Sequence, residues 1–586
     1  MNNLKRTHYC GEINHDLIGQ EVVICGFVQK VRNLGNLIFV DIRDRSGFVQ
    51  IAFNNKSDQR LIETVQKVRA EFVVAAKGRV KTRDSINKTI KNGDVEIYVS
   101  DFEVLSKAKT TPFEIIDNNN VKEELRLKYR YLDLRRPELQ KTLMLRHKIV
   151  KVARDYYDEN GFLEIETPIL IKSTPEGARD YLVPSRVHQG CFFALPQSPQ
   201  LYKQLLMVAG YDKYMQIARC FRDEDLRADR QPEFTQIDLE MSFVDENDVM
   251  SVNEGFIKRL FKQLMNLDIK TPFKRLTYYE AMNRFGSDKP DTRFGMELTD
   301  ITDILTKTEF KVFSSAVSEG GSVRAINVKN SADVLTRKEI DKLTDIVKTY
   351  KGKGLAFSRF VEGKVSSSFE KFLTEAEIKE IHRRLDFQDN DVILIVSDVN
   401  NNIVFDCLGN LRCHLARKLS LIPENQYNFL WVTDFPLFEY DDEEKRYVSV
   451  HHPFTAPKLD CINLLETDPG KVLSNAYDIV LNGYELGGGS IRIHNQELQQ
   501  KIFDIIGLTK EEADKKFGFL LEALKYGVPP HGGMAYGLDR LVMLMTNKES
   551  LRDVIAFPKV QNSSELMTGC PSEVDEESLK DLGLKK

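Results

Sequence analysis

The densest group of residues that could carry out chemistry lies at 214–243, where two alternating stretches flank a charged loop. On the second stretch Gln236, Asp238 and Glu240 alternate with apolar residues, which places a row of acceptors on one face of a strand. Arg222 falls just before the loop. A guanidinium binds phosphate or carboxylate oxygens in a bidentate manner, and a carboxylate binds an ammonium group. These types suit a site for a zwitterion and a polyphosphate, although the composition of the loop alone favours a solvated charged hairpin.

A second candidate site lies in the N-terminal region. Residues 20–105 alternate as short strands joined by turns, with one helix near 58–70, a pattern typical of an OB-type barrel. Phe39 shares a strand face with charged residues instead of the aliphatic set. Such an aromatic stacks unpaired bases in OB folds, and Arg32 and Gln50 could lie beside it. A small core under a loop is an equally good interpretation from periodicity alone.

Further elements must position these residues. Residues 109–138 are charged and irregular and indicate a hinge, and apolar spacing predicts a helix over 139–158 that leads into a strand. Residues 299–420 resemble an inserted α+β module. Two Thr-x-x-Glu sequences, beginning at Thr336 and Thr374, predict helices that start with capping boxes.

The composition excludes several classes of protein. Of the 586 residues 42% are apolar and 29% are charged, which excludes disordered, collagen-like and coiled-coil chains. Apolar runs fall short of the roughly 18 residues of a membrane span, and the first residues contain no apolar signal core. The 8 Cys form no Cys-x-x-Cys pair, so we expect neither a disulfide framework nor a zinc site. We therefore expect a cytoplasmic protein without a membrane partner.

The charges are distributed unevenly. Residues 1–108 contain 17 Lys and Arg against 13 Asp and Glu, whereas the whole chain carries a formal net charge of −5. This excess weakly indicates a polyanionic partner at one end of the chain, but a random fluctuation is the better explanation on this observation alone.

Three strings in order resemble the motifs of a known family. FRDE at 221–224 and QPEFTQID at 231–238 resemble motif 2 of class II aminoacyl-tRNA synthetases, in the version carried by the aspartyl-tRNA synthetase family. The helix and strand at 139–168, ending in Pro168, match motif 1, and GMAYGLDRL at 533–541 matches motif 3. Class I signatures and a Walker A loop are absent from the sequence.

Shorter sequence motifs make the resemblance more specific. TPEGARDY at 174–181, QSPQLYK at 197–203, HHPF at 451–454 and GGGSIR at 487–492 are similar to the family's aspartate-site strings, and GSDKPD at 286–291 resembles the bacterial type. The resemblance implies a multidomain α/β fold with an OB-fold barrel, an antiparallel-sheet catalytic domain and an inserted GAD-type α+β domain. The implied boundaries are 1–108 for the anticodon-binding barrel, 109–138 for the hinge, 139–298 and 421–558 for the catalytic domain, 299–420 for the insertion and 559–586 for a C-terminal extension.

The resemblance also implies the reaction. L-aspartate attacks the α-phosphate of ATP, which gives aspartyl-adenylate and pyrophosphate, and the aspartyl group then passes to the 3′ end of tRNA-Asp. Arg222 should hold the α-phosphate and the substrate carboxylate, and Arg540 the γ-phosphate, so both are the expected catalytic residues. The other residues expected to bind ATP are Glu224, Gln231, Glu485, Gly537, Leu538 and Asp539. Asp478 and Glu485 should hold Mg²⁺.

For aspartate, the resemblance implies that Lys203 and Arg492 clamp the β-carboxylate. Two cations would reject asparagine, because a neutral amide leaves buried positive charge unpaired. Asp238 and Glu176 should recognise the α-ammonium group. The remaining residues expected to bind aspartate are Gln200, Arg222 and His451.

In the barrel the resemblance makes Arg32, Phe39 and Gln50 the expected anticodon-binding residues. Leu34 lies where family members that charge only tRNA-Asp tend to avoid His, so we expect a discriminating enzyme. Motif 1 implies a homodimer. Two alternatives stay open at this point: a sister synthetase for asparagine or lysine, against which Lys203 and Arg492 argue, and a catalytically dead RNA-binding paralogue, against which the retained motif arginines argue.

Overall fold

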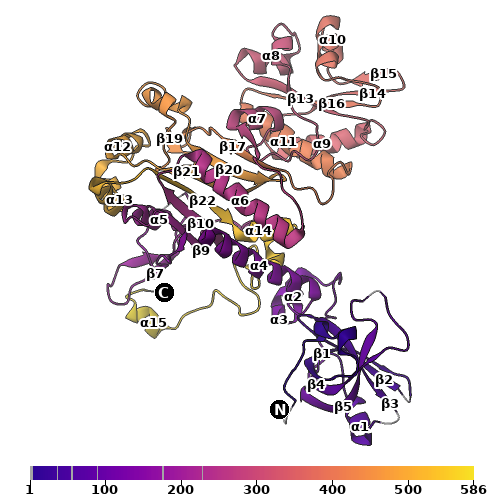
Figure 1. Ribbon diagram of the computed structural model, residues 1–586. Coiled ribbons are helices and arrows are strands. Elements are labelled where there is room, and N and C mark those ends of the chain that lie inside the picture. The colour runs from indigo at the N-terminus through magenta and orange to yellow at the C-terminus, as the bar shows by residue number, and fades with distance from the viewer. Residues whose placement is uncertain are drawn as a thin grey trace. The chain divides into compact units, whose positions relative to one another are not determined.

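The computed structural model (Figure 1) describes residues 4–585 apart from 36, 55–56, 89, 175–176 and 227–228. Its contacts divide the chain into two compact units, Met1–Arg146 with Lys548–Glu573 and His147–Asn547 with Val574–Lys586. None of the helices in the described ranges is both long enough and apolar enough to span a membrane. The domain boundaries expected from the sequence stay predictions.

The first unit contains a closed barrel with the strand order β1-β2-β3-β5-β4. Its elements are η1 (Cys10–Glu12), η2 (His15–Leu17), β1 (Glu21–Asn33), β2 (Leu37–Asp44), β3 (Gly47–Asn54), α1 (Gln59–Val65), β4 (Val73–Thr82) and β5 (Val95–Ser106). The alternation predicted for β2 is confirmed, because Ile38, Val40 and Ile42 are at most 1% exposed. Phe39 on the opposite face is half-buried. The barrel is the OB-type fold that the sequence predicts.

The rest of the first unit packs around a buried arginine. It comprises α2 (Glu123–Lys128), α3 (Arg130–Asp133), the start of α4 (Pro137–Glu159) and η8 (Leu551–Asp553). Arg130 is 2% exposed and donates hydrogen bonds to the carbonyls of Arg552, Ile555 and Ala556 at 3.0, 2.9 and 2.9 Å. These bonds fix residues near 552–556 against the predicted hinge.

The second unit is built on an eight-stranded sheet with the order β11-β17-β20-β21-β22-β10-β9-β6. The pairings from β17 to β9 are antiparallel, and the two edge pairs, β11 with β17 and β6 with β9, are parallel. The strands are β6 (Leu163–Glu164), β9 (Lys213–Phe221), β10 (Glu233–Ser242), β11 (Lys274–Thr277), β17 (Phe429–Thr433), β20 (Ala476–Leu481), β21 (Tyr484–Ile491) and β22 (His531–Gly537). The sheet pairs β10 with β22, two segments that lie about 300 residues apart in the sequence.

Further helices complete the second unit. Those of the second unit outside the insertion are α5 (Gln200–Val208), α6 (Glu246–Met265), α7 (Tyr278–Phe285), α12 (Gln496–Ile505), α13 (Lys510–Ala523), α14 (Leu538–Met545) and α15 (Glu576–Asp581), with η5 (Leu459–Leu465), η6 (Pro469–Lys471) and η7 (Leu524–Tyr526). Two small hairpins pair β7 (Leu182–Pro184) with β8 (Phe192–Ala194) and β18 (Phe438–Asp441) with β19 (Arg446–Ser449). Phe256 of α6 packs against Tyr157 of α4 and Tyr536 of β22, with ring centroids 5.2 and 5.5 Å apart.

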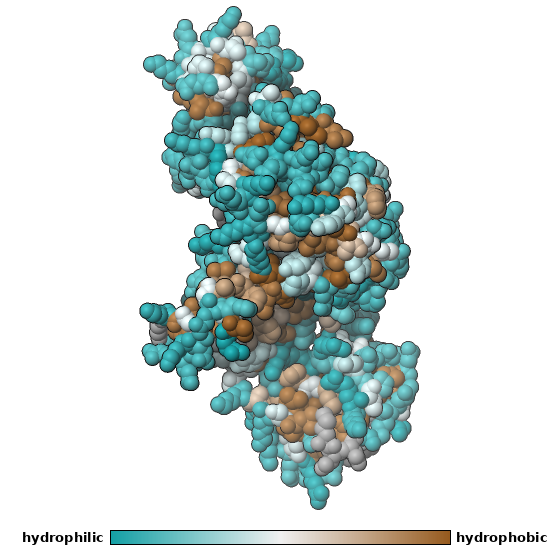
Figure 2. All heavy atoms as spheres, turned by 90° about the vertical axis from the view of Figure 1, so that its left-hand side faces the viewer, coloured by the Kyte–Doolittle hydropathy of each residue, from teal (hydrophilic) through white to brown (hydrophobic). Residues whose placement is uncertain are grey.

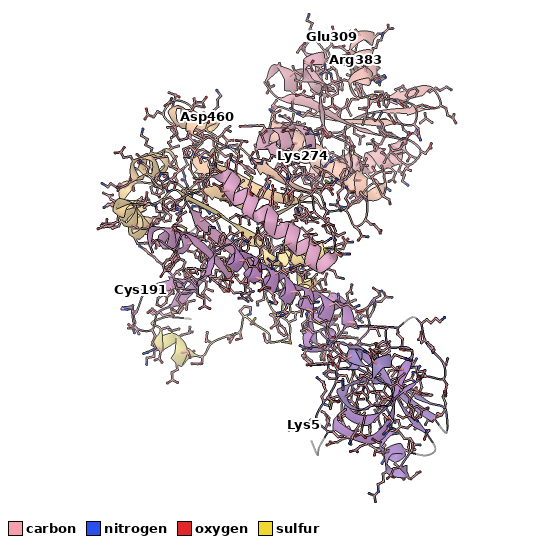
Figure 3. The ribbon with its side chains drawn as sticks, viewed as in Figure 1. Lys5, Cys191, Lys274, Glu309, Arg383 and Asp460 are labelled. Atoms are coloured by element: carbon pink, nitrogen blue, oxygen red, sulfur yellow. The ribbon has the colours of Figure 1, made fainter. Side chains whose placement is uncertain are left out.

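The inserted residues form their own five-stranded sheet, in the order β12-β13-β16-β14-β15. Its elements are β12 (Thr299–Asp300), η3 (Thr302–Leu305), α8 (Lys311–Ser318), β13 (Ser322–Val328), α9 (Arg337–Thr349), β14 (Ala356–Val361), β15 (Lys364–Ser367), η4 (Glu370–Phe372), α10 (Glu375–Arg384), β16 (Val392–Asp398) and α11 (Asn401–Lys418). One hydrophobic core joins the sheet to α9 and α11, and another joins it to α8 and α10. Glu309 and Arg383 mark the α8 and α10 side in Figure 3.

One of the two predicted capping boxes is confirmed. The Thr374 hydroxyl accepts from Glu377 N at 3.3 Å, and Glu377 Oε2 accepts from Thr374 N at 2.7 Å. The prediction for Thr336 is wrong, because its side chain makes no capping hydrogen bond. Glu339 instead forms ion pairs with Lys342 and Lys418, which compete for the carboxylate. Outside these cores the surface is largely polar, and Figure 2 shows apolar atoms in separate patches among hydrophilic side chains.

Candidate active site

Four buried charged side chains meet on the central strands of the sheet. Asp238 and Glu240 alternate on β10, Lys203 extends from α5, and Arg492 follows β21. Lys203 Nζ lies 2.7 Å from Asp238 Oδ1 and 3.2 Å from Glu240 Oε2. Arg492 donates from Nε and Nη2 to the two oxygens of Glu240 at 2.9 and 3.1 Å. All four are at most 4% exposed, so the structure brings together three predicted residues and adds Glu240.

The two carboxylates of this cluster differ in their electrostatics. Burial acts to raise the pKa of Glu240, but Arg492 and Lys203 outweigh it and hold that pKa at about 2. For Asp238, burial dominates over Lys203 and raises the pKa above its ordinary value. Asp238 Oδ2 is buried and finds no hydrogen-bond partner among the described residues. A buried acceptor without a partner is unusual and suits an ammonium donor from a ligand.

Gln200 supplies a matching donor. It begins α5, one helical turn before Lys203, and is 7% exposed. Its Nε2 is buried, and the part of the chain that the structure describes offers it no acceptor. An open acceptor on Asp238 and an open donor on Gln200 are what an amino acid with its own ammonium and carboxylate would satisfy.

Two of the predicted ATP-binding residues are arginines that follow strands of the same sheet. Arg222 follows β9, and its guanidinium lies over the ring of Phe234 at 5.1 Å. Arg540 lies in the first turn of α14 and donates from Nη1 to the carbonyl of Glu485 at 2.6 Å. Within the described ranges, the buried Nε of Arg222 and that of Arg540 both lack a hydrogen-bond acceptor. Arginines with unused donors suit an anion such as phosphate.

The other predicted ATP residues are distributed around these arginines. Glu224 accepts from Arg230 Nη1 at 2.8 Å, and Gln231 is 3% exposed at the end of the loop. Gly537 and Leu538 join β22 to α14. Asp539 Oδ2 accepts from Thr235 N at 2.9 Å, so this carboxylate ties α14 to β10. Because the Asp539 side chain is used in this contact, we expect its backbone to bind a ligand.

The predicted metal ligands lie on neighbouring strands, Asp478 on β20 and Glu485 on β21. Burial raises the pKa of Glu485, and the negative charge of Asp478 raises it further. The negative charge that Asp478 places beside Glu485 suits a cation between the two carboxylates. Mg²⁺ is typically bound by one or two carboxylates together with substrate phosphates, so the pair fits this ion. The described residues contain no larger cluster of His, Cys, Asp and Glu that could form an all-protein metal site.

Two histidines lie near these groups. His451 Nε2 is 3.7 Å from Asp478 Oδ1, and its ring meets Phe435 edge to face at 4.6 Å between centroids. Burial acts to lower the pKa of His451, but Asp478 outweighs it and raises that pKa. His452 was not predicted. Burial, Arg492 and Lys203 lower the pKa of His452 to about 3, so it is neutral beside the cations.

Glycines make room for the charged groups. A Cβ atom at Gly488 would lie 2.2 Å from Asp478 Oδ1, and one at Gly533 would lie 2.2 Å from Glu240 Oε2. Both distances are far below van der Waals contact, so any side chain here would displace a carboxylate. Gly488 on β21 and Gly533 on β22 therefore provide space for the carboxylates of Asp478 and Glu240.

The barrel brings the three predicted anticodon residues together. Arg32 and Phe39 are paired across β1 and β2, with the guanidinium 5.9 Å from the ring centroid. Arg32 Nη2 donates to Gln50 Oε1 at 2.7 Å and to Asp41 Oδ1 at 2.9 Å. Gln50 Nε2 in turn donates to Glu96 at 2.5 Å, a residue that the sequence did not indicate. This face of the barrel, opposite its apolar core, combines a ring with fixed hydrogen-bonding groups.

One predicted residue, Glu176, lies outside the described residues. Glu240 was missed although its position on the polar face of β10 was already visible in the alternation. Its role as the partner of both cations depends on α5 and β21, which the sequence does not place beside β10.

Comparisons with known proteins agree with this arrangement. A family model described as "tRNA synthetases class II (D, K and N)" matches residues 122–561, and one described as "OB-fold nucleic acid binding domain" matches residues 22–105. The chain is 59% identical over 585 residues to the aspartate–tRNA ligase of Ruminiclostridium cellulolyticum, covering 99% of this chain and 98% of the relative. It is 56% identical over 587 residues to the aspartate–tRNA(Asp/Asn) ligase of Caldanaerobacter subterraneus, covering 100% and 99%.

Among solved structures, the asparaginyl-tRNA synthetase from Pyrococcus horikoshii complexed with asparaginyl-adenylate aligns with a TM-score of 0.60. The alignment covers 95% of this chain and 98% of that chain at 21% sequence identity. At this identity the likeness supports the fold alone.

Proposed function

This chain belongs to the class II tRNA synthetases of the D, K and N group, and from that premise we propose the reaction it catalyses and the residues that perform it. It is an aspartate–tRNA ligase. The observation that supports aspartate most directly is the buried cluster of Lys203, Arg492, Asp238 and Glu240, with an unused acceptor on Asp238.

In the first step the substrate α-carboxylate attacks the α-phosphate of ATP. A new O–P bond forms, the bond to the β-phosphate breaks, and pyrophosphate leaves. Arg222 binds the α-phosphate, where negative charge develops, and Arg540 binds the γ-phosphate. Fixed cations at such positions stabilise the transition state without reorganisation. Asp478 and Glu485 would hold Mg²⁺, which neutralises phosphate charge when bound.

The amino acid is held by groups that are already charged and buried. Its ammonium group donates to Asp238 Oδ2, and its β-carboxylate accepts from Lys203 and Arg492. Glu176 also accepts from the ammonium group, Arg222 and Gln200 bind the α-carboxylate, and His451 closes over the amino acid. Glu224, Gln231 and the backbone of Gly537, Leu538 and Asp539 surround the nucleotide.

In the second step the 3′-terminal hydroxyl of the tRNA attacks the aspartyl carbonyl, and AMP leaves. Arg32, Phe39 and Gln50 bind the anticodon, where the ring stacks on a base and the polar groups contact its edge. We propose that the enzyme acts in the cytoplasm as a homodimer whose interface includes residues 139–168.

Pyrophosphate exchange into ATP, driven by each amino acid separately, tests the substrate. We expect exchange with aspartate and none above background with asparagine or lysine. Exchange with asparagine but not with aspartate would overturn the proposal, and so would full aminoacylation by an Arg222→Ala variant.

A second question concerns the tRNA. One relative is named aspartate–tRNA(Asp/Asn) ligase, whereas another is named aspartate–tRNA ligase. Leu34 lies 69% exposed in the turn after β1, beside the proposed anticodon face, and this position leads us to propose a discriminating enzyme. Equal charging of tRNA-Asp and tRNA-Asn transcripts would overturn that assignment.

A further inference from the structure

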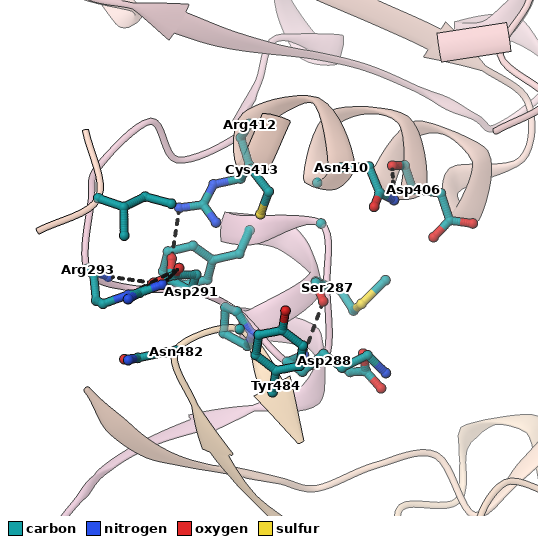
Figure 4. A pocket seen from close by; sticks show the side chains of 18 of the residues that line it. Ser287, Asp288, Asp291, Arg293, Asp406, Asn410, Arg412, Cys413, Asn482 and Tyr484 are labelled. Atoms are coloured by element: carbon teal, nitrogen blue, oxygen red, sulfur yellow. Dashed lines mark hydrogen bonds and ion pairs between the residues drawn. The ribbon is translucent and has the colours of Figure 1, made fainter. Parts of the chain in front are cut away.

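Two cavities outside the proposed active site are lined by charged side chains. The larger, of about 580 Å³, lies in the second unit between α11 and the turn of the β20–β21 hairpin (Figure 4). Two of its arginines are used within the protein: Arg412 donates to the carbonyl of Asp291 at 3.1 Å, and Arg293 pairs with the Asp291 carboxylate at 2.7 Å. The smaller cavity, of about 370 Å³, lies in the first unit.

This smaller cavity, here called the arginine pocket, is formed by the N-terminal segment, the β1–β2 pair and the end of the predicted hinge. Among the described residues that line it, Asp44 is the only one with a carboxylate. Its cations are Arg6, Arg43, Arg45 and Arg135, and its aromatic rings are those of Tyr9 and Phe27.

Two of the four arginines have a carboxylate partner. Arg43 and Arg135 both bind Glu71, at 2.7 and 2.8 Å. Both also lie against the ring of Phe27, with the guanidinium carbons 5.9 and 4.2 Å from its centroid. These contacts join the barrel to the predicted hinge, so this pair of arginines is satisfied by the fold itself.

The other two arginines, Arg6 and Arg45, are exposed and form no ion pair within the described ranges. Both lie against the ring of Tyr9, with the guanidinium carbons 4.7 and 5.2 Å from its centroid, and Tyr9 is held by its N–H, which donates to Glu12 at 2.8 Å. Arg6 donates to the Cys25 carbonyl at 2.8 Å, and Arg45 to the Tyr9 hydroxyl at 3.3 Å. Since a guanidinium has five donors, most of those on Arg6 and Arg45 can still bind an anion.

The charges around the pocket favour such an anion. The Asp44 carboxylate is already used by backbone donors, because Oδ1 accepts from Ser46 N and Oδ2 from Cys10 N, both at 2.8 Å. Glu71 is shared by the two inner arginines. Arg6 and Arg45 therefore bring two positive charges to one ring, and an anion between them would offset their repulsion.

The arginine pocket lies on the same face of the barrel as the proposed anticodon residues. Phe39 and Arg43 alternate with core residues on β2, so their side chains leave the sheet on one side. On β1, Arg32 pairs with Phe39, and Phe27 pairs with Arg43. The two pairs are four strand residues apart, or about 13 Å at roughly 3.3 Å per residue. A stacked nucleic-acid strand covers that distance with about four nucleotides.

We propose that the arginine pocket binds a phosphate group of the tRNA backbone, with Arg6 and Arg45 as its ligands. Guanidinium groups bind phosphate oxygens in a bidentate manner, and contact with a ring orients them for it. The shared face with Arg32 and Phe39 favours tRNA over a free nucleotide. The excess of 17 Lys and Arg over 13 Asp and Glu in residues 1–108 favours it too. This inference rests on the proposed function, since it gives the tRNA a second contact on the barrel.

The salt dependence of tRNA binding tests the phosphate contact. Filter binding of a tRNA-Asp transcript is measured between about 50 and about 200 mM KCl. Arg6→Gln and Arg45→Gln should each weaken binding about tenfold, and together they should reduce the slope of log K against log[KCl] by about 1, the value for one phosphate. Arg45→Lys keeps the charge and should keep the slope. Arg60→Gln, at an exposed arginine on α1 of the same barrel, is the matched control and should bind as the wild type.

Two results would overturn the site. One is binding by the double variant that equals that of the Arg60→Gln control at every salt concentration. The other is weaker binding with an unchanged slope, since such a loss would come from a disturbed barrel and not from a lost phosphate contact. Failure of the proposed function is distinguishable, because the wild type itself would then show no aspartate-dependent pyrophosphate exchange.

Discussion

Replacing Glu240 by Gln should strongly destabilise the catalytic sheet, because Glu240 is the shared counter-ion of two buried cations. Both its oxygens accept from Arg492, at 2.9 and 3.1 Å, and Lys203 Nζ lies 3.2 Å from Oε2. The amide has the same shape but carries no charge, and its NH₂ group would face donors. The variant therefore leaves two cations close together in a buried environment with only Asp238 to balance them.

Two routes give the size of this effect. Removing one partner of a buried ion pair costs about 3–5 kcal/mol. Burial acts to raise the pKa of Glu240 above its ordinary 4.5, but Arg492 and Lys203 outweigh it and hold the value at about 2. Because one pKa unit corresponds to about 1.4 kcal/mol, this difference amounts to about 3 kcal/mol. The two routes agree on a loss of roughly 3 kcal/mol in the free energy of unfolding.

The lowered pKa of Glu240 also determines how the stability of the protein depends on pH. Since the pKa of Glu240 is depressed in the folded state, its contribution is complete above the ordinary value of 4.5 and is lost as pH falls toward about 2. The wild type should therefore lose stability through this window more steeply than the Gln variant. The difference between the two proteins should shrink as the solution becomes more acid.

The fluorescence of Trp431 can report the unfolding of this sheet specifically. This residue is the only Trp in the sequence, and it is fully buried in β17 of the same sheet. Its fluorescence during urea unfolding at neutral pH reports the free energy of unfolding of the sheet. Glu466→Gln is the matched control, because Glu466 forms an ion pair with Lys501 at 2.7 Å in which both side chains are exposed. If Glu240→Gln unfolded at the same urea concentration as this control, the argument from buried charge would be wrong.

Three further changes test other parts of the molecule. Phe39→Ala should weaken tRNA binding by about 1–3 kcal/mol, the value of one stacked base, and should leave pyrophosphate exchange unchanged. A filter-binding assay with tRNA-Asp measures the affinity, and equal affinity of the variant and the wild type would exclude stacking. Gly488→Ala should displace the Asp478 carboxylate and raise the Mg²⁺ concentration for half-maximal exchange about tenfold, whereas Gly354→Ala, which has open space, should not. Arg222→Ala should lower kcat of exchange by about 100-fold or more, and an effect confined to KM would refute a transition-state contact.

Much of the fold follows from local sequence patterns. The strict alternation on β2 is confirmed by burial, because a strand with one polar face can be placed in only one register. The helix predicted over 139–158 forms as α4 (Pro137–Glu159). These elements are specified by near neighbours in the chain. The resemblance to a known family then orders them in space, which periodicity alone does not do.

Long-range partners are what the sequence could not supply. Thr336 and Thr374 carry the same capping pattern, yet only Thr374 caps its helix, since Glu339 is drawn to Lys418, 79 residues away. Glu240 was visible as a polar residue on β10, but its two cations come from α5 and from the end of β21. The hydrogen bond from Arg412 to the carbonyl of Asp291 likewise joins segments more than 100 residues apart. The functional roles of the site residues stay predictions.

In the proposed binding mode, the charge balance of the buried cluster accounts for selectivity for aspartate. Lys203 and Arg492 carry two positive charges, and Asp238 and Glu240 carry two negative charges, all at most 4% exposed. In this mode Arg222 balances the α-carboxylate, and the ammonium and β-carboxylate groups of aspartate add one charge of each sign to the four-residue cluster, so the filled cluster stays neutral. Asparagine would add the ammonium group alone and leave one positive charge unbalanced away from water, which is costly. A mutation that removes a cation, such as Lys203→Met, should therefore narrow the preference for aspartate over asparagine, and an unchanged ratio of kcat/KM would show that selectivity arises elsewhere.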